Sequence, residues 1–428
     1  MTTHPTMRSR VVLAAIATLL CMMAASVAVA QTPDPVQPGG PWVTPNQNIS
    51  LEAFSSYEEL TDELTKIDRR SDVVEVESAG VTGQGRDIWL AKIGEPSKTP
   101  VLIITQQHGD EPHGTEAALS IIKKLSTNSA KARQVLDELY VLVVPRVNPD
   151  GSTIPERGNL DFDAPVRDSR SCFDGAGNVI DSRLDQGRGV FTTDIELDDG
   201  TVAWSYDINR YHWPDWSDSW QIRCNPGLVG PNFDPMQNPV PEAVAVLETY
   251  EAYQPIWVID VHNQGISAVV EDPAGDGANR PNRRVTSSVL WPTNEGVNEQ
   301  SRDLSKQLAL AMKLRSLELG YSEMTRYVGG SFPGIARNAY GLLGNERIAD
   351  GETVAGGSVL VEISGQTEGG PSVNIGQKSI GKLVNEARSI IWAALDTTAD
   401  GSLFDLDPDR AEQLILVNDV DIDNPRIE

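Results

Sequence analysis

The sequence predicts an α/β fold: a single domain built around a mixed, mostly parallel twisted sheet with helices on both faces. The first observation is a set of short apolar runs, such as Val101 to Thr105 and Leu139 to Val144, typical of strands buried on both faces. The second is that such runs alternate with segments of helical spacing along most of the chain. The third is an ordinary composition, 39% apolar and 22% charged among 428 residues, which excludes collagen-like and low-complexity chains.

The elements can be assigned in chain order. Ser56 and Glu59 form a capping-box pattern before Leu60, Leu64 and Ile67, so a helix is expected to begin here. A second helix is expected later in the chain, and six apolar segments are expected to be strands. The second helix is Gly114–Leu125, and the strands are Val73–Val76, Ile88–Ile93, Val101–Thr105, Leu139–Val144, Ile256–Val261 and Val359–Ile363.

The first thirty residues have the pattern of a secretory signal. Arg8 and Arg10 precede an almost wholly apolar stretch, 11–30, which ends in the A-x-A cleavage pattern Ala28-Val29-Ala30. We therefore expect residues 1–30 to be removed, residues 31–50 to form an extended leader, and the protein to be secreted or periplasmic. An uncleaved anchor helix is the alternative, because an apolar stretch of this length can span a bilayer. The small residues before the cleavage point favour removal.

Two cysteines remain after signal removal, Cys172 and Cys224, and in an exported protein they most simply form one disulfide. A pair of buried thiols or a reactive cysteine is the alternative. Both lie in a long excursion, 158–225, which is rich in Asp and Gly and too long for a plain connection. An acidic tail, 396–428, ends the chain.

The charge balance limits the partners. The chain has 35 Lys+Arg and 61 Asp+Glu, a formal charge of −26. Nucleic acid and anionic lipid both require a basic surface, so we expect neither as a partner. No membrane association is expected after signal cleavage, and we expect a monomer.

Two histidines come directly after predicted buried strands, where α/β sheets bind their ligands. His108 begins a short loop that also holds Glu111, and His262 follows the strand that ends at Val261. Two imidazoles and one carboxylate with a fourth position open form the ligand set of a catalytic zinc ion. We therefore expect one zinc ion per chain, held by His108, Glu111 and His262.

Other polar groups follow in a definite order. Asn148-Pro149-Asp150-Gly151 ends a predicted strand, and Arg157 comes soon after it. Asp207-Ile208-Asn209-Arg210 comes next, and Tyr340 then precedes Glu362 by 22 residues. Glu362 lies within an apolar strand, where a carboxylate is costly unless it is paired or functional.

In this order, and with the lead-in Gly85-Arg86-Asp87-Ile88, these segments resemble the carboxypeptidase A-like zinc metallocarboxypeptidases from about Ser56 to Leu395. The resemblance implies a catalytic domain over residues 51–395 that removes C-terminal residues from peptides with a free C-terminus. It also implies the site roles. The metal ligands would be His108, Glu111 and His262, and Glu362 would be the general base that acts on zinc-activated water. Arg157 would polarise the scissile carbonyl. Asn209 and Arg210 would bind the terminal carboxylate, and Tyr340 would be the tyrosine that closes over the substrate.

Several alternatives stay open at this level. The step from Arg157 to Arg210 is 53 residues, longer than is usual for the family, so Arg146 competes for the role of Arg157. Side-chain preference is expected to depend on the stretch between Tyr340 and Glu362, where Glu346, Arg347 and Asp350 give conflicting hints. A zinc amidohydrolase of the same fold, acting on cell-wall peptides or N-acyl amino acids, is the alternative function.

Overall fold

The computed structural model describes residues 54–127, 129–160, 200–212, 238, 240–265, 285–349, 351–365, 377–414 and 416. It also describes the backbone of short strand segments at 172–173, 179–180, 192–196, 269–270 and 283–284. The predicted signal sequence, the leader, Cys224 and the side chain of Cys172 lie outside the described residues.

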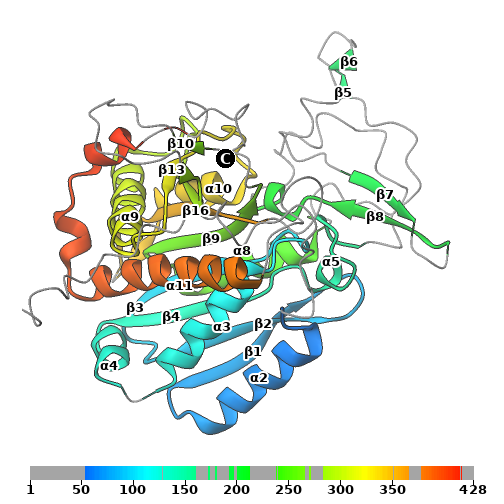
Figure 1. Ribbon diagram of the computed structural model, residues 1–428, viewed down its shortest axis with the longest axis horizontal. Helices are drawn as coiled ribbons and strands as arrows, with labels where there is room; N and C mark the ends of the chain where they lie inside the picture. The colour runs from blue at the N-terminus through cyan, green and yellow to red at the C-terminus, as the bar shows by residue number, and fades with distance from the viewer. Residues whose placement is uncertain are drawn as a thin grey trace, which may run out of the picture. The chain divides into compact units, whose positions relative to one another are not determined.

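Eight strands of the described residues form one sheet in the order β1-β2-β4-β3-β9-β16-β12-β13 (Figure 1). Four neighbouring pairs are parallel (β4-β3, β3-β9, β9-β16 and β12-β13), and three are antiparallel. The predicted mixed, mostly parallel sheet is therefore confirmed. Its strands are β1 (Val74–Val81), β2 (Asp87–Ile93), β3 (Thr99–Thr105), β4 (Leu139–Val144), β9 (Trp257–Gln264), β12 (Ser287–Leu290), β13 (Met324–Arg326) and β16 (Gly357–Ser364).

Successive side chains of a strand point to opposite faces of the sheet, so both faces are apolar, and helices cover each of them. In β3, Val101 and Ile103 join the core on one face, and Leu102 and Ile104 join the core on the other. Helices α3 and α11, cyan and orange in Figure 1, lie side by side on the first face. The first face is covered by α2 (Tyr57–Arg70), α3 (His113–Leu125), α4 (Ala130–Leu136), α9 (Glu299–Glu318) and α11 (Gln377–Ala399), and the second by α8 (Pro241–Tyr253) and α10 (Ala336–Gly344).

The remaining elements are short. They are α5 (Pro149–Thr153), the 3-10 helices η2 (Ile208–Arg210), η5 (Ser402–Asp405) and η6 (Pro408–Gln413), and the two-stranded pairs β5 (Cys172–Phe173) with β6 (Val179–Ile180), β7 (Thr192–Glu196) with β8 (Val202–Tyr206), β10 (Val269–Val270) with β11 (Arg283–Arg284) and β14 (Ile348–Ala349) with β15 (Glu352–Thr353).

The capping box predicted at the first helix is present. Ser56 Oγ accepts a hydrogen bond from the Glu59 amide at 3.1 Å, and Glu59 Oε2 accepts one from the Ser56 amide at 2.9 Å. Leu60, Leu64 and Ile67 are buried as their spacing predicts. Reciprocal satisfaction of two amides at the helix start therefore fixes where α2 begins.

The chain stays packed beyond residue 395, where the sequence predicts an acidic tail. Helix α11 continues to Ala399, and η5 and η6 follow it. Leu403, Ala411 and Leu414 are buried in the core on the α11 side of the sheet. These few apolar residues are scattered among acids, so the composition of the segment hides their contribution to the core.

Strands β3, β9 and β16 are adjacent and parallel, so their carboxyl ends share one edge of the sheet. Thr105 is the last residue of β3, and His262 and Glu362 lie near the ends of β9 and β16. Segments far apart in the sequence therefore meet at this edge, where ligands bind in sheets of this kind.

Candidate metal centre

The three predicted metal ligands lie together at the carboxyl edge of the sheet. His108 and Glu111 belong to a turn after β3, in which the Glu111 amide donates to the His108 carbonyl at 3.1 Å. His262 lies in β9, directly after Val261, which pairs with Thr105 at the end of β3. Strand pairing thus brings the turn beside His262.

The ligand atoms of these residues face one another. His108 Nδ1 lies 2.8 Å from Glu111 Oε1, and His262 Nδ1 lies 2.9 Å from Glu111 Oε2. The two Nδ1 atoms are 3.0 Å apart, and all three residues are buried. Two ring nitrogens this close repel unless a proton or a cation lies between them. The donor set, two nitrogens and one carboxylate, is the one that catalytic zinc sites use.

Two further carboxylates orient the imidazoles. His108 Nε2 lies 2.9 Å from Asp207 Oδ1, and His262 Nε2 lies 2.9 Å from Asp260 Oδ2. An ionised carboxylate only accepts hydrogen bonds, so each Nε2 carries the hydrogen and each Nδ1 keeps its lone pair. Metal-binding histidines are typically oriented in this way. The arrangement therefore fits a metal ion held through both Nδ1 atoms.

The charges of the centre are strongly coupled. Burial acts to raise the pKa of Glu111, but the two histidines outweigh it and lower that pKa below its ordinary value. Burial and Arg157 act to lower the pKa of His108, but Glu111 and Asp207 raise it overall. The surplus negative charge around the imidazoles therefore favours a cation at the centre.

A chain of hydrogen bonds leads from Asp260 into the protein interior. Gln107 Nε2 donates to Asp260 Oδ2 at 2.7 Å, and Gln107 Oε1 lies 2.5 Å from His212 Nε2. His212 Nδ1 lies 2.7 Å from the hydroxyl oxygen of Tyr340. Burial lowers the pKa of His212 to about 4, so the ring is neutral at pH 7. Its Nε2 then donates to Gln107, and its Nδ1 accepts from the Tyr340 hydroxyl.

This chain determines where Tyr340 lies. The residue belongs to α10, is 0% exposed, and packs its ring 5.1 Å from that of Tyr250. Burial raises the pKa of its hydroxyl well above the ordinary value. The structure thus connects Tyr340 to His262 through His212, Gln107 and Asp260, and does not bring it to the open side of the centre.

Arg157 lies beside the predicted metal ligands. Its Nη1 is 3.3 Å from Glu111 Oε1 and its Nη2 is 3.3 Å from Asp207 Oδ2. Its side chain remains 37% exposed. Burial acts to lower its pKa, but Asp207 and Glu111 raise it overall, so the charge is permanent. A cation that touches the centre and still reaches solvent can meet an incoming carbonyl group.

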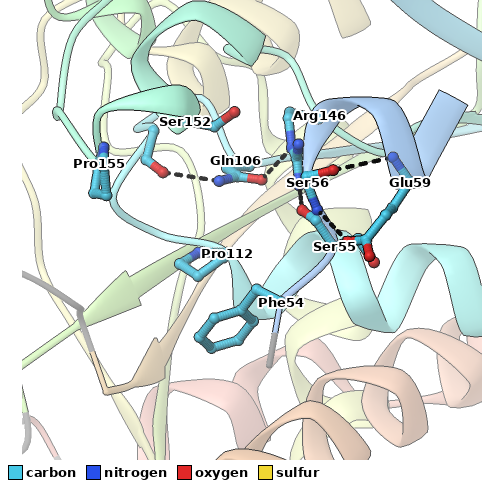
Figure 2. A pocket seen from close by; sticks show the side chains of 10 residues that line it. Phe54, Ser55, Ser56, Glu59, Gln106, Pro112, Arg146, Ser152 and Pro155 are labelled. Carbon is cyan, nitrogen blue, oxygen red and sulfur yellow. Dashed lines mark hydrogen bonds between the residues drawn. The ribbon is translucent and has the colours of Figure 1, made fainter. Parts of the chain in front are cut away.

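Arg146, the competitor from the sequence, faces the other side of the same loop. Its Nε donates to Gln106 Oε1 at 2.8 Å, and its Nη2 donates to the Ser55 carbonyl at 2.7 Å. Figure 2 shows it beside Gln106, and both residues line a pocket with a volume of about 370 Å³. The Gln106 backbone has a φ of 52°, and its side-chain Nε2 donates to the Gly109 carbonyl at 2.8 Å. Arg146 therefore supports the turn that carries His108.

Asn209 and Arg210 lie in η2, next to the centre. Asn209 Oδ1 accepts a hydrogen bond from the Ala336 amide at the start of α10, at 3.2 Å. Arg210 Nε lies 3.5 Å from Asp207 Oδ2, and Asp207 also contacts His108. Asp207 alone therefore separates Arg210 from the predicted metal ligand His108.

Glu362 lies directly opposite His262 in the parallel pairing of β16 with β9. Its side chain points to the α10 face, because its neighbours Val361 and Ile363 belong to the core on the other face. Burial and the nearby charge of Glu111 raise the pKa of Glu362 to about 7, against the lowering effect of the two histidines. A carboxylate with this pKa can both accept and release a proton near pH 7.

Of the three residues that gave conflicting hints on side-chain preference, the structure describes Glu346 and Arg347, and it does not bring either to the centre. Arg347 Nε donates to the carbonyl of Gln254, which precedes β9, so Arg347 is at the amino edge of the sheet. Glu346 is exposed, and Asp350 lies outside the described residues. The sequence stretch is therefore long enough to cross from one edge of the sheet to the other.

Sequence reasoning missed three residues. Asp207 appears in the sequence only within a motif, two residues before Asn209, and Gln107, directly before His108, gives no signal there. Arg337 was also missed. It follows Ala336, which contacts Asn209, and no local pattern marks it because its position depends on how α10 packs.

The comparisons with known proteins agree with this geometry. A family profile described as zinc carboxypeptidase matches residues 60–325. Carboxypeptidase SOL1 of Arabidopsis thaliana is 30% identical over 157 residues, which are 33% of this chain and 32% of that protein. Human carboxypeptidase D is 27% identical over 116 residues, 25% of this chain and 8% of that protein. The matches thus span well under two thirds of these relatives.

A solved structure of similar fold is the carboxypeptidase A of Helicoverpa armigera. It superimposes with a TM-score of 0.54 at 16% identity, over 83% of this chain and 77% of that chain. At this identity the likeness concerns the fold. In the described part of the chain, no helix has both the length and the apolar character needed to cross a membrane.

Proposed function

The chain belongs to the zinc carboxypeptidase family, and on this premise we propose that it is a zinc-dependent exopeptidase that hydrolyses the C-terminal peptide bond of its substrates. The observation that carries the proposal is the pairing of Glu362 with His262 across β16 and β9. It supplies a proton-accepting carboxylate, outside the ligand set, beside the cluster of His108, Glu111 and His262.

The chemistry follows from these neighbours. Zinc bound by His108, Glu111 and His262 would supply a Lewis acid that polarises a carbonyl group and lowers the pKa of water. Glu362 takes a proton from the attacking water and passes it to the nitrogen of the leaving residue. Arg157, in contact with Glu111 and partly exposed, steadies the negative charge that develops on the carbonyl oxygen.

Cleavage at the C-terminus follows from the cationic end of the site. Arg210 lies on the same short helix as Asn209 and beside Asp207. A guanidinium binds a carboxylate through two parallel hydrogen bonds, and the Asn209 amide adds a further donor. We expect this pair to bind the terminal carboxylate of the peptide. A chain that continues beyond the residue to be released would then not fit.

The role of a tyrosine that closes over the substrate requires a side chain able to reach it. Tyr340 is fully buried, so we propose that it acts from within the protein, through its hydrogen bond to His212.

Paired peptides with a free or an amidated C-terminus test the function. The zinc-loaded protein should release the last residue of the free peptide and cleave the amidated peptide far more slowly. The groups that bind the terminal carboxylate would have no charged partner in the amidated peptide. Arg210→Ala should raise KM for the free peptide and reduce this discrimination. Equal cleavage of both peptides, or cuts in mid-chain, would favour an amidohydrolase or an endopeptidase.

We also propose export, a monomer, and a disulfide between Cys172 and Cys224. The apolar segment before Gln31 and the cysteine pair support these proposals. N-terminal sequencing of protein recovered from a producing cell should find Gln31 first. Thiol titration of the unfolded, unreduced protein should find no free thiol, whereas two reactive thiols would contradict the disulfide.

A further inference from the structure

Arg337 is a buried cation that the proposed chemistry does not use. It is the second residue of α10, 3% exposed, and its Nη2 donates to the Gly330 carbonyl at 2.6 Å. Its Nε has no hydrogen-bond partner, and the residue makes no ion pair within the described part of the chain. A buried guanidinium with one neutral partner is costly, so an anion is expected to complete its surroundings.

The position of Arg337 is fixed by contacts on both sides. The preceding residue, Ala336, donates its amide to Asn209. A Cβ atom added at Gly334 would lie 2.4 Å from the Arg210 carbonyl, so the turn before α10 packs directly on η2. Arg337 therefore lies next to the residues that we expect to bind the terminal carboxylate.

The guanidinium also lies on the same face of the sheet as Glu362. A Cβ at Gly329 would meet Arg337 Nη2 at 2.4 Å and Leu290 Cδ2 at 3.1 Å, which puts the guanidinium beside Leu290. Leu290 pairs with Leu360, which precedes Glu362 by two residues. Alternate residues of a strand share a face, about 7 Å apart. Arg337 is thus one side-chain row away from Glu362.

We propose that Arg337 binds an acidic side chain on the C-terminal residue of the substrate, so that the protein prefers peptides ending in glutamate or aspartate. The inference rests on the proposed function. Arg210 binds the α-carboxylate, and Arg337, on the next helix, binds the side-chain carboxylate. Burial and, to a lesser extent, the charge of Arg210 lower the pKa of Arg337 to about 10, whereas Glu362 and Asp260 act to raise it. It therefore stays charged at neutral pH.

Four peptides that differ only in the last residue (Glu, Gln, Leu or Lys) test the preference in the zinc-loaded protein. Glutamine has the shape of glutamate without its charge, so the ratio of kcat/KM for Glu over Gln isolates the ion pair. We expect a ratio of about 10²-fold, the order found for truncating a buried charge pair. Arg337→Met should bring the ratio close to one, and Arg337→Lys should keep part of it.

The matched control is Arg315→Met, which removes the same charge from the exposed side of α9, where Arg315 pairs with Glu318. It should leave the ratio unchanged. A wild-type ratio near one would overturn the inference, as would an equal loss on all four peptides in Arg337→Met, which would assign Arg337 to the α-carboxylate. If the wild type releases no C-terminal residue from any peptide, the proposed function itself fails. Unfolding temperature and zinc content identify a variant that has lost its fold.

Discussion

Replacing Glu362 by glutamine tests the centre at its most informative position. The amide has nearly the same size but cannot take up a proton. Glu362 is not among the clustered metal ligands, so the variant should keep its fold and its zinc. General-base catalysis contributes about 10²–10⁴-fold. Because Glu362 also returns the proton to the leaving nitrogen, we expect a loss of kcat toward the upper end of that range.

The pH dependence gives a second magnitude. The pKa of Glu362 is raised to about 7 by burial and Glu111. The ionised form is the base, so activity is lost as the pH falls. With a pKa of about 7, roughly half of the groups are ionised at pH 7 and about a tenth at pH 6, a loss of about fivefold in kcat/KM. Bound zinc adds positive charge and lowers this pKa, so fivefold is the largest loss expected.

The assay is release of the terminal residue from a peptide between pH 5 and pH 8, followed by chromatography. Zinc content and unfolding temperature are measured for each variant. Glu346→Gln, at an exposed position, is the matched control and should retain full activity. The reasoning is refuted if Glu362→Gln keeps more than about a tenth of kcat, or if it loses activity in acid at the same pH as the wild type.

Three further predictions concern other residues of the centre and its surroundings. His262→Ala should lose bound zinc, measured by metal analysis after dialysis, and full occupancy would contradict its role as a ligand. Arg157→Ala should lower kcat by about 10²–10³-fold, as expected for a lost oxyanion partner, whereas Arg146→Ala should mainly lower the unfolding temperature; the reverse result would restore Arg146 as the catalytic arginine. Tyr340→Phe removes one buried hydrogen bond and should cost about 1–3 kcal/mol in the free energy of unfolding, measured in urea, and an unchanged stability would show that the bond to His212 contributes nothing.

The sequence predicted those parts of the site that the sheet itself determines. His108 and His262 could be grouped because each follows a run of buried strand residues, and neighbouring parallel strands bring such ends together; Glu111 shares the loop of His108. Glu362 could be added because an isolated carboxylate in an apolar strand is costly. These inferences need only the direction of the strands and the cost of burial.

The parts that were not predictable depend on how the helices pack. Arg347 is close to Glu362 in the sequence but lies at the opposite edge of the sheet, because the chain crosses the sheet between α10 and β16. Tyr340 has the expected spacing from Glu362, but spacing does not show which way a helical residue points. Arg337 gives no signal in the sequence because only the contact of α10 with Asn209 brings it to the site.

The hydrogen-bond chain from Asp260 to Tyr340 has a consequence for proton traffic. Every hydrogen in it points toward Asp260, and neutral His212 keeps that order at pH 7. The far end, the Tyr340 hydroxyl, is sealed from solvent, with His212 as its partner in the described part of the chain. The Tyr340 end of this row of hydrogen bonds therefore offers protons no route to bulk water. Glu362, which is partly exposed, lies on a side of the site by which protons released during hydrolysis can leave.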